Sequence, residues 1–80
     1  MKLLVTGGAG FIGANFVHYT LAHHPEHTVT VLDALTYAGD RTKLDSVRDR
    51  IRFIEGSITD QLLTNELVEA NDVVVHFAAE

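Results

Sequence analysis

Three glycines at intervals of three residues, directly after an apolar segment, constrain the fold of this chain more than any other feature. The apolar segment is Leu3–Val5, and the glycines are Gly7, Gly10 and Gly13. An amphipathic helical pattern then extends from about residue 10 to residue 23. A strand, a glycine turn and the start of a helix are the parts that hold a pyrophosphate on backbone N–H groups.

Each of these glycines has a separate expected role. Gly7 lets the chain leave the strand in a tight turn in which φ is positive. Gly10 has no Cβ, so the backbone can come close to phosphate oxygens, and Gly13 allows the helix to pack closely on the neighbouring strands. The free N–H groups of the first helical turn and the positive end of the helix dipole then face the anion.

An acidic residue at the expected distance supports the same interpretation. Asp33 ends the apolar segment 29–32 and comes about 20 positions after the last glycine. Its carboxylate can accept hydrogen bonds from the adenosine ribose, whereas a 2′-phosphate would meet like charge, and Ala34 supplies no cation for that phosphate. We therefore expect NAD rather than NADP as the cofactor. The alternative, in which Asp33 only caps the following loop, stays open.

Apolar segments and helical patterns alternate along the rest of the chain. We expect strands over residues 2–6, 28–33, 51–55 and 72–77, and helices over about 10–23, 41–47 and about 59–70. This alternation predicts an α/β fold, a Rossmann-type doubly wound parallel sheet with helices on both faces. Right-handed crossovers give the strand order 3-2-1-4 and place the ligand crevice between the first and fourth strands.

The length limits how much of such a fold the chain contains. A chain of 80 residues holds at most one domain. A complete dinucleotide-binding domain has six parallel strands, so we expect residues 1–80 to be its N-terminal part, with a substrate domain absent from this chain. The fourth strand would then expose an edge, and an exposed edge favours association with another chain.

Composition excludes several classes of protein. Hydrophobic residues make up 46% of the chain, which is typical of a globular protein. The chain has no cysteine, no signal-peptide pattern and no apolar segment of about 18 residues, so we expect a cytoplasmic protein without a membrane partner. The net charge of −5 argues against nucleic acid as a partner. The basic residues between positions 41 and 52 are expected on a solvated surface; a minor alternative places one of them beside a nucleotide phosphate.

Histidines cluster near the end of the first helix and raise the question of a metal. His18 and His23 are five residues apart and share no helix face, and Pro25 interrupts the register. The segment 23–27 is therefore expected to be a solvated helix end with no metal site.

Three segments of the chain resemble a known enzyme family. Residues 6–13, Thr-Gly-Gly-Ala-Gly-Phe-Ile-Gly, resemble the TGGxGFIG signature of the extended short-chain dehydrogenase/reductase family. Residues 33–39 and 76–80 look like the D-x-L-T-Y-A-G and H-[FL]-A-A-E segments of one group in that family, the dTDP-glucose 4,6-dehydratases. The glycine motif specifies only the superfamily, and the other two segments are more specific.

The resemblance implies a cofactor site at the carboxyl ends of the strands. It implies that Phe11 and Ile12 contact the NAD phosphates through their backbone. It further implies that Ala34, Leu35 and Thr36 lie around the adenosine ribose with Asp33. It places a second group beside the nicotinamide: Phe77, Ala78, Ala79 and Glu80. Ser57 and Ile58 are expected near the adenine. Ser57 stands where the family commonly has Asp, and it can equally be only a turn hydroxyl.

The activity implied by the resemblance is the NAD-dependent dehydration of dTDP-glucose to dTDP-4-keto-6-deoxyglucose, a step toward dTDP-rhamnose. The longer protein is expected to be a homodimer. Neither Tyr19 nor Tyr37 is followed by lysine at the fourth position, so the family's Tyr-x-x-x-Lys pair is expected beyond residue 80. We therefore expect no catalytic residue within residues 1–80 and no turnover by this chain alone.

Two other functions stay open at this point. Another enzyme of the extended family, such as a sugar-nucleotide 4-epimerase or decarboxylase, would share the glycine motif and Asp33. A non-catalytic nucleotide-binding module would share them as well.

Overall fold

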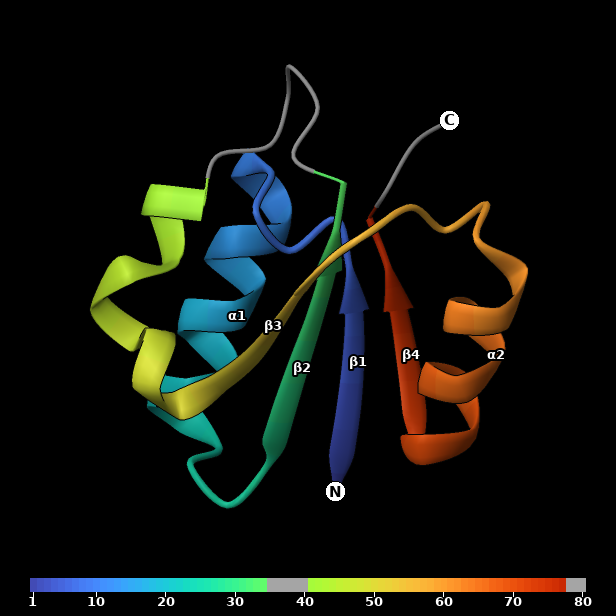
Figure 1. The fold of residues 1–80 in the computed structure, drawn as a ribbon. Helices are drawn as coiled ribbons and strands as arrows, with labels where there is room; N and C mark the ends of the chain where they lie inside the picture. The colour runs from blue at the N-terminus through green and yellow to red at the C-terminus, as the bar shows by residue number, and fades with distance from the viewer. Residues whose placement is uncertain (35–40, 78–80) are drawn as a thin grey trace.

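The computed structural model describes residues 1–34 and 41–77 (Figure 1). The elements follow in the order β1 (Lys2–Thr6), α1 (Phe11–His23), β2 (Thr28–Asp33), η1 (Arg41–Arg50), β3 (Ile51–Glu55), α2 (Gln61–Ala70) and β4 (Val73–His76). Strands and helices alternate as predicted. The segment η1 is a 3₁₀ helix and ends at Arg50 rather than at residue 47.

The four strands form one parallel sheet in the order β3-β2-β1-β4, which confirms the predicted order and the Rossmann-type fold. Val5 of β1 pairs in register with Val31 of β2 on one side and with Val75 of β4 on the other. Val31 pairs in turn with Phe53 of β3. Because the strands are parallel, their carboxyl ends lie at one edge of the sheet, on the side where the chain leaves β1 for the glycine turn (Figure 1).

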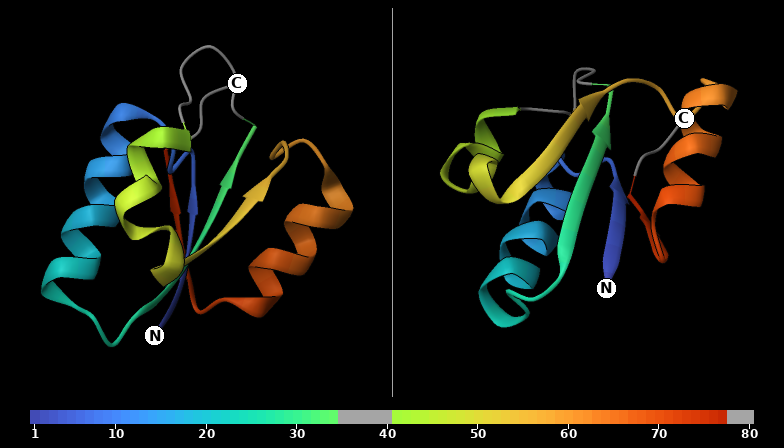
Figure 2. Two further views of the ribbon diagram at one scale, coloured as in Figure 1. Left: turned by 60° about the vertical axis from the view of Figure 1, so that its left-hand side comes forward. Right: turned by 60° about the horizontal axis from the view of Figure 1, so that its bottom comes forward.

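Helices cover both faces of the sheet, as the sequence predicts (Figure 2). The side chains of β1 alternate between two cores: Leu3 and Val5 pack toward α1 and η1, and Leu4 packs toward α2. Burial on both faces explains why the middle of β1, Leu3–Val5, is continuously apolar instead of alternating with polar residues. No helix in the described part of the chain is long and apolar enough to cross a membrane.

The apolar spacing of α1 predicts a core-facing stripe of Phe11, Ile12, Phe16, Val17 and Leu21, and the first turn of the helix departs from this stripe. Val17 and Leu21 are buried as expected, but the side chains of Phe11 and Ile12 are 74% and 68% exposed. The first turn of α1 lies beside the glycine turn at the carboxyl edge of the sheet, where strands no longer cover it (Figure 1). Two large apolar side chains are therefore exposed at the predicted cofactor site.

Helix α2 is capped at both ends by side chains. The carboxylate of Asp60, at the N-cap, accepts a hydrogen bond from the Leu63 N–H at 3.2 Å, and the Asn71 Nδ2 donates to the Leu67 carbonyl at 2.7 Å. The apolar spacing predicts a core face of Leu62, Leu63, Leu67 and Ala70. This prediction is wrong at Leu62, which is 79% exposed, because the face that meets the sheet centres on Leu63 and Leu67. Ala70 is also exposed.

Candidate cofactor-binding site

The turn after β1 begins at Gly7, whose φ is 74°. Its N–H donates a hydrogen bond to the Leu32 carbonyl at 2.8 Å, and its carbonyl accepts one from the Gly10 N–H at 3.1 Å. A side chain at this φ would be strained, so the turn requires glycine here. The predicted positive φ is confirmed.

Gly13 is needed for a different reason from the one expected. A Cβ at this position would lie 2.2 Å from the Gly7 carbonyl oxygen and 3.0 Å from the Gly8 Cα. The close approach is thus between α1 and the backbone of the glycine turn, and not between α1 and the strands. The absence of a side chain at Gly13 lets the helix begin directly against the turn.

Gly8 has a packing role that the three-residue spacing gave no reason to expect. A Cβ there would lie 2.6 Å from Cγ1 of Val31, a fully buried side chain of β2. The turn therefore rests on β2 as well as on its own helix.

The start of α1 offers backbone donors without side-chain competitors. Gly10 is the N-cap in extended conformation, and it makes no side-chain cap hydrogen bond. The first turn of α1 contains no acidic residue. The first N–H groups of a helix have no partner within the helix, and no acidic side chain of the first turn of α1 itself offsets the positive end of the dipole. This geometry suits an anion such as a pyrophosphate.

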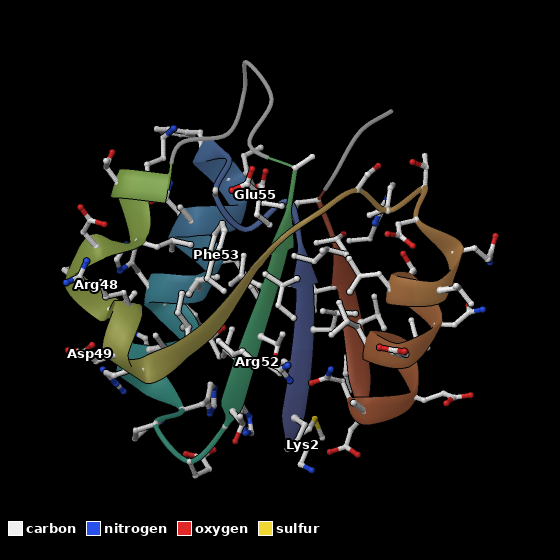
Figure 3. All side chains as sticks on the ribbon, in the orientation of Figure 1. Lys2, Arg48, Asp49, Arg52, Phe53 and Glu55 are labelled. Carbon is white, nitrogen blue, oxygen red and sulfur yellow. The ribbon has the colours of Figure 1, made fainter. Side chains whose placement is uncertain are left out.

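Asp33 joins the end of β2 to the glycine turn. Its side chain is 8% exposed, and its Oδ2 accepts a hydrogen bond from the Ala9 N–H at 2.9 Å. This bond connects the carboxylate to the preceding glycine turn, which the sequence did not indicate. Glu55, labelled in Figure 3, pairs in register with Asp33, so two acidic residues end neighbouring strands.

The other predicted residues near the adenosine are placed in part. Ala34 is exposed directly after Asp33, whereas Leu35 and Thr36 lie outside the described residues. Ser57 forms a local turn, since its Oγ accepts a hydrogen bond from the Thr59 N–H at 3.1 Å. Ile58 is half-buried and packs in the core beneath α2. Their contact with the adenine remains a prediction.

The end of β4 reaches the same edge of the sheet. The Phe77 N–H donates to the Thr6 carbonyl at 2.8 Å, and Thr6 Oγ1 and His76 Nδ1 share a hydrogen bond of 2.6 Å. The Phe77 ring packs against Phe16 of α1, with the ring centroids 5.5 Å apart. Gly7–Gly13 and Phe77 therefore come together as predicted, while Ala78, Ala79 and Glu80 lie outside the described residues.

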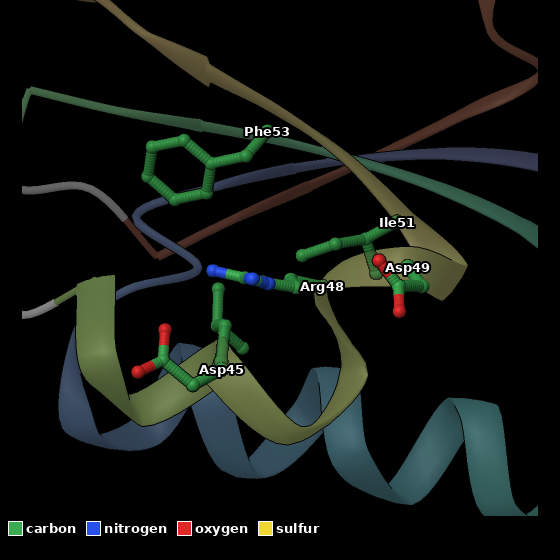
Figure 4. A pocket seen from close by; sticks show the side chains of 6 residues that line it. Asp45, Arg48, Asp49, Ile51 and Phe53 are labelled. Atoms are coloured by element: carbon green, nitrogen blue, oxygen red, sulfur yellow. The ribbon is translucent and has the colours of Figure 1, made fainter.

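A separate hollow of about 430 Å³ lies between η1 and β3 (Figure 4). It is lined by Leu44, Asp45, Arg48, Asp49, Ile51 and Phe53. These residues come from η1 and from the start and middle of β3, whereas the predicted site lies where strands end. Arg48 is accompanied there by two carboxylates, which makes the hollow a poor site for a phosphate.

Comparison with known proteins assigns the chain to a family. The model of the NAD dependent epimerase/dehydratase family matches residues 3–80. The chain belongs to this family. The features described above thus occur in a member of the NAD dependent epimerase/dehydratase family: the glycine turn, the uncapped start of α1 and the acidic residue at the end of β2.

Several members of the family are similar over the whole chain. The dTDP-glucose 4,6-dehydratase of Mycobacterium tuberculosis is 62% identical over 80 residues, covering 100% of this chain and 24% of that protein. DesIV, a dTDP-glucose 4,6-dehydratase from Streptomyces venezuelae crystallised with NAD and TYD, superposes with a TM-score of 0.92 at 50% identity, over 100% of this chain and 27% of that one.

A solved structure of an enzyme with another activity is more distant. The UDP-glucose 4-epimerase of Thermotoga maritima has a TM-score of 0.83 at 32% identity, over 100% of this chain and 25% of that one. The chain therefore spans about a quarter of the length of the relatives it matches.

Proposed function

We propose that residues 1–80 form the N-terminal, NAD-binding part of a dTDP-glucose 4,6-dehydratase, whose substrate domain lies in the remainder of a longer protein. The observation that carries the cofactor assignment is the hydrogen bond between Asp33 and Ala9, which places a carboxylate beside an uncapped helix start. The higher identity to dehydratases than to the epimerase supports the reaction.

The described residues fit NAD in two places. The N–H groups at the start of α1 would hold the pyrophosphate, and the turn that presents them is fixed by Gly7 and Gly13. Asp33 would accept hydrogen bonds from the adenosine ribose, and the carboxylates of Asp33 and Glu55 would repel a 2′-phosphate. This charge arrangement favours NAD over NADP.

The chemistry requires both the cofactor and residues beyond the described part. NAD, when bound, accepts a hydride from the sugar and returns it. The role of residues 1–77 is to bind and orient the cofactor, and the described residues contain no Tyr-x-x-x-Lys pair. The dTDP-glucose substrate, a homodimer and a cytoplasmic location are parts of this proposal.

The test uses the complete protein to which residues 1–80 belong, incubated with NAD and dTDP-glucose. We expect mass spectrometry to show a product that has lost one water. An isomer of the substrate with unchanged mass would replace the dehydratase by an epimerase. NAD binding without turnover of any sugar nucleotide would support a non-catalytic module instead.

A further inference from the structure

The turn that connects α1 to β2 is held in one conformation by its backbone. The His24 N–H donates to the Thr20 carbonyl at 2.7 Å, and the His27 N–H donates to the His24 carbonyl at 3.0 Å. Pro25 occupies the second position of this four-residue turn, where its fixed φ is favourable. The next residue, Thr28, donates its N–H to the Met1 carbonyl at 2.9 Å. The turn is therefore a rigid support for its side chains.

Three side chains of this turn converge. The rings of His24 and His27 are stacked, with their centroids 5.2 Å apart and their planes at 18°. Glu26 Oε2 lies 3.6 Å from Nδ1 of His24 and 3.6 Å from Nδ1 of His27. One potential ligand atom from each of the three residues lies within 4.8 Å of the other two.

The ring nitrogen of His27 gives an independent indication of a missing ligand. His27 Nδ1 is buried and is the single buried side-chain polar atom without a hydrogen-bond partner in the described part of the chain. Buried polar atoms in folded proteins usually have a partner, and their exceptions call for an explanation such as an ion. The lone pair of a neutral imidazole nitrogen is a common metal ligand.

We propose that His24, Glu26 and His27 bind a divalent transition metal ion such as Zn²⁺. Two imidazole nitrogens and one carboxylate oxygen are a ligand set that Zn²⁺ prefers. Ligand atoms about 2.0–2.2 Å from a tetrahedral ion lie roughly 3.4 Å apart. The nitrogen–oxygen separations of 3.6 Å are close to this spacing, and one of the two stacked rings would turn to point its nitrogen at the ion. Water would complete the coordination.

The proposal departs from the expectation that this segment binds no metal. That expectation covered the segment 23–27 and rested on the spacing of His18 and His23 and on the break at Pro25, whereas neither of these two histidines belongs to the site. His18 shares a hydrogen bond with the Lys43 carbonyl, and the His23 ring packs against Tyr19 with the two ring planes tilted by 32°. Pro25, which interrupts the helix, produces the turn that brings the three ligands together.

The site is distinct from the cofactor site in position and in role. It lies at the far end of α1 from the glycine turn (Figure 1), and 13 helical residues correspond to about 20 Å. An ion there would clamp the end of α1 to the beginning of β2. We therefore infer a structural ion that stabilises the fold and takes no part in cofactor chemistry.

Zinc titration of the chelator-treated protein tests the site. We expect one equivalent of Zn²⁺ to bind and to raise the melting temperature, while Mg²⁺ does neither, because it prefers oxygen ligands. His24→Ala, Glu26→Gln and His27→Ala should each weaken Zn²⁺ binding by about tenfold or more. His23→Ala is the matched control, and its affinity should equal that of the wild type.

Long-range ¹H–¹⁵N spectra of the imidazoles identify the ligand atoms directly. On addition of Zn²⁺, the Nδ1 signals of His24 and His27 should shift, and those of His18 should not. No binding by the wild type, or binding that persists after both His24→Ala and His27→Ala are introduced together, would overturn the proposal. Neither result would bear on NAD binding, which uses the opposite end of α1.

Discussion

The carboxylate of Asp33 accepts a hydrogen bond from the Ala9 N–H at 2.9 Å, so the residue that is expected to bind the ribose also holds the glycine turn. Substitutions at position 33 therefore act on two functions at once. The two functions can be separated because asparagine keeps a side-chain oxygen that can accept a hydrogen bond from the Ala9 N–H, whereas alanine has no such oxygen.

Asp33→Ala and Asp33→Asn should consequently differ in stability. Alanine leaves the Ala9 N–H without its partner, which costs about 1–3 kcal/mol of unfolding free energy when the group is buried. Asparagine should recover most of that loss. Urea unfolding of both variants measures the difference, and equal stabilities would show that the hydrogen bond contributes little.

The same two variants should be alike in cofactor selectivity. Both remove the charge that repels a 2′-phosphate, so the preference for NAD over NADP should fall in both relative to the wild type. Calorimetry with the two dinucleotides measures the ratio of affinities. A ratio unchanged in Asp33→Asn would shift the explanation from charge to shape.

Gly8→Ala and Gly13→Ala should both destabilise the glycine turn, but only the first should be rescued. The Cβ at position 8 meets the Val31 side chain, whereas the Cβ at position 13 meets the Gly7 backbone oxygen. Overpacking of this kind costs about 1–3 kcal/mol. In a Val31→Ala background the cost of Gly8→Ala should shrink and that of Gly13→Ala should not.

Unfolding experiments on the wild type, the three single variants and the two double variants give the two coupling energies. Asn15→Ala, on the exposed side of α1, is the control and should change stability little. If Val31→Ala rescued both glycine variants equally, the two contacts would not be separate.

Glu26 predicts an acid dependence of stability that Glu26→Gln removes. A hydrogen bond from its own backbone N–H, followed by the charges of His27 and His24, lowers the pKa of Glu26 below its usual 4.5. A carboxyl group whose pKa is lower in the folded state than in the unfolded chain stabilises the fold at pH values above the unfolded pKa. This stabilisation is lost as the pH falls through the lowered value. In chelator-containing buffer, the wild type should lose more stability than Glu26→Gln as pH decreases below about 4.5. Parallel pH profiles would contradict this.

The exposed edge of β4 should make the 80-residue chain self-associate. Within the described residues β4 pairs only with β1, and the Val74 side chain is 43% exposed. An unpaired, apolar edge strand is a template for another chain, and lysine on such a strand opposes pairing. Sedimentation should show concentration-dependent association that Val74→Lys reduces. A monodisperse wild-type monomer would refute the prediction.

Local sequence patterns were sufficient for the architecture. The apolar segments predicted the strands, and the glycine spacing predicted the positive φ of Gly7. Thr59 or Asp60 was expected to cap α2, and the cap is Asp60. Each of these features depends on residues close together in the chain. Phe11 and Leu62 were placed in the core wrongly, because a helical stripe does not show where the sheet ends or which part of the helix face meets it.

Contacts between distant residues were not available from sequence patterns. The bond between Asp33 and Ala9 and the contact of Gly8 with Val31 depend on β2 lying beside the glycine turn. The convergence of His24 with His27 was missed for another reason. Helical spacing rules out a site on His18 and His23, but it does not describe the turn that follows the break at Pro25.

The central position of β1 has a consequence for synthesis of the chain. Lys2 and Asp72 are bound to each other across a separation of 70 residues, because β1 lies between β2 and β4. At about 5–20 residues per second, synthesis of the intervening segment takes on the order of 4–14 s. Throughout that time one side of β1 has no strand to pair with, so the strand made first is among the last to be enclosed.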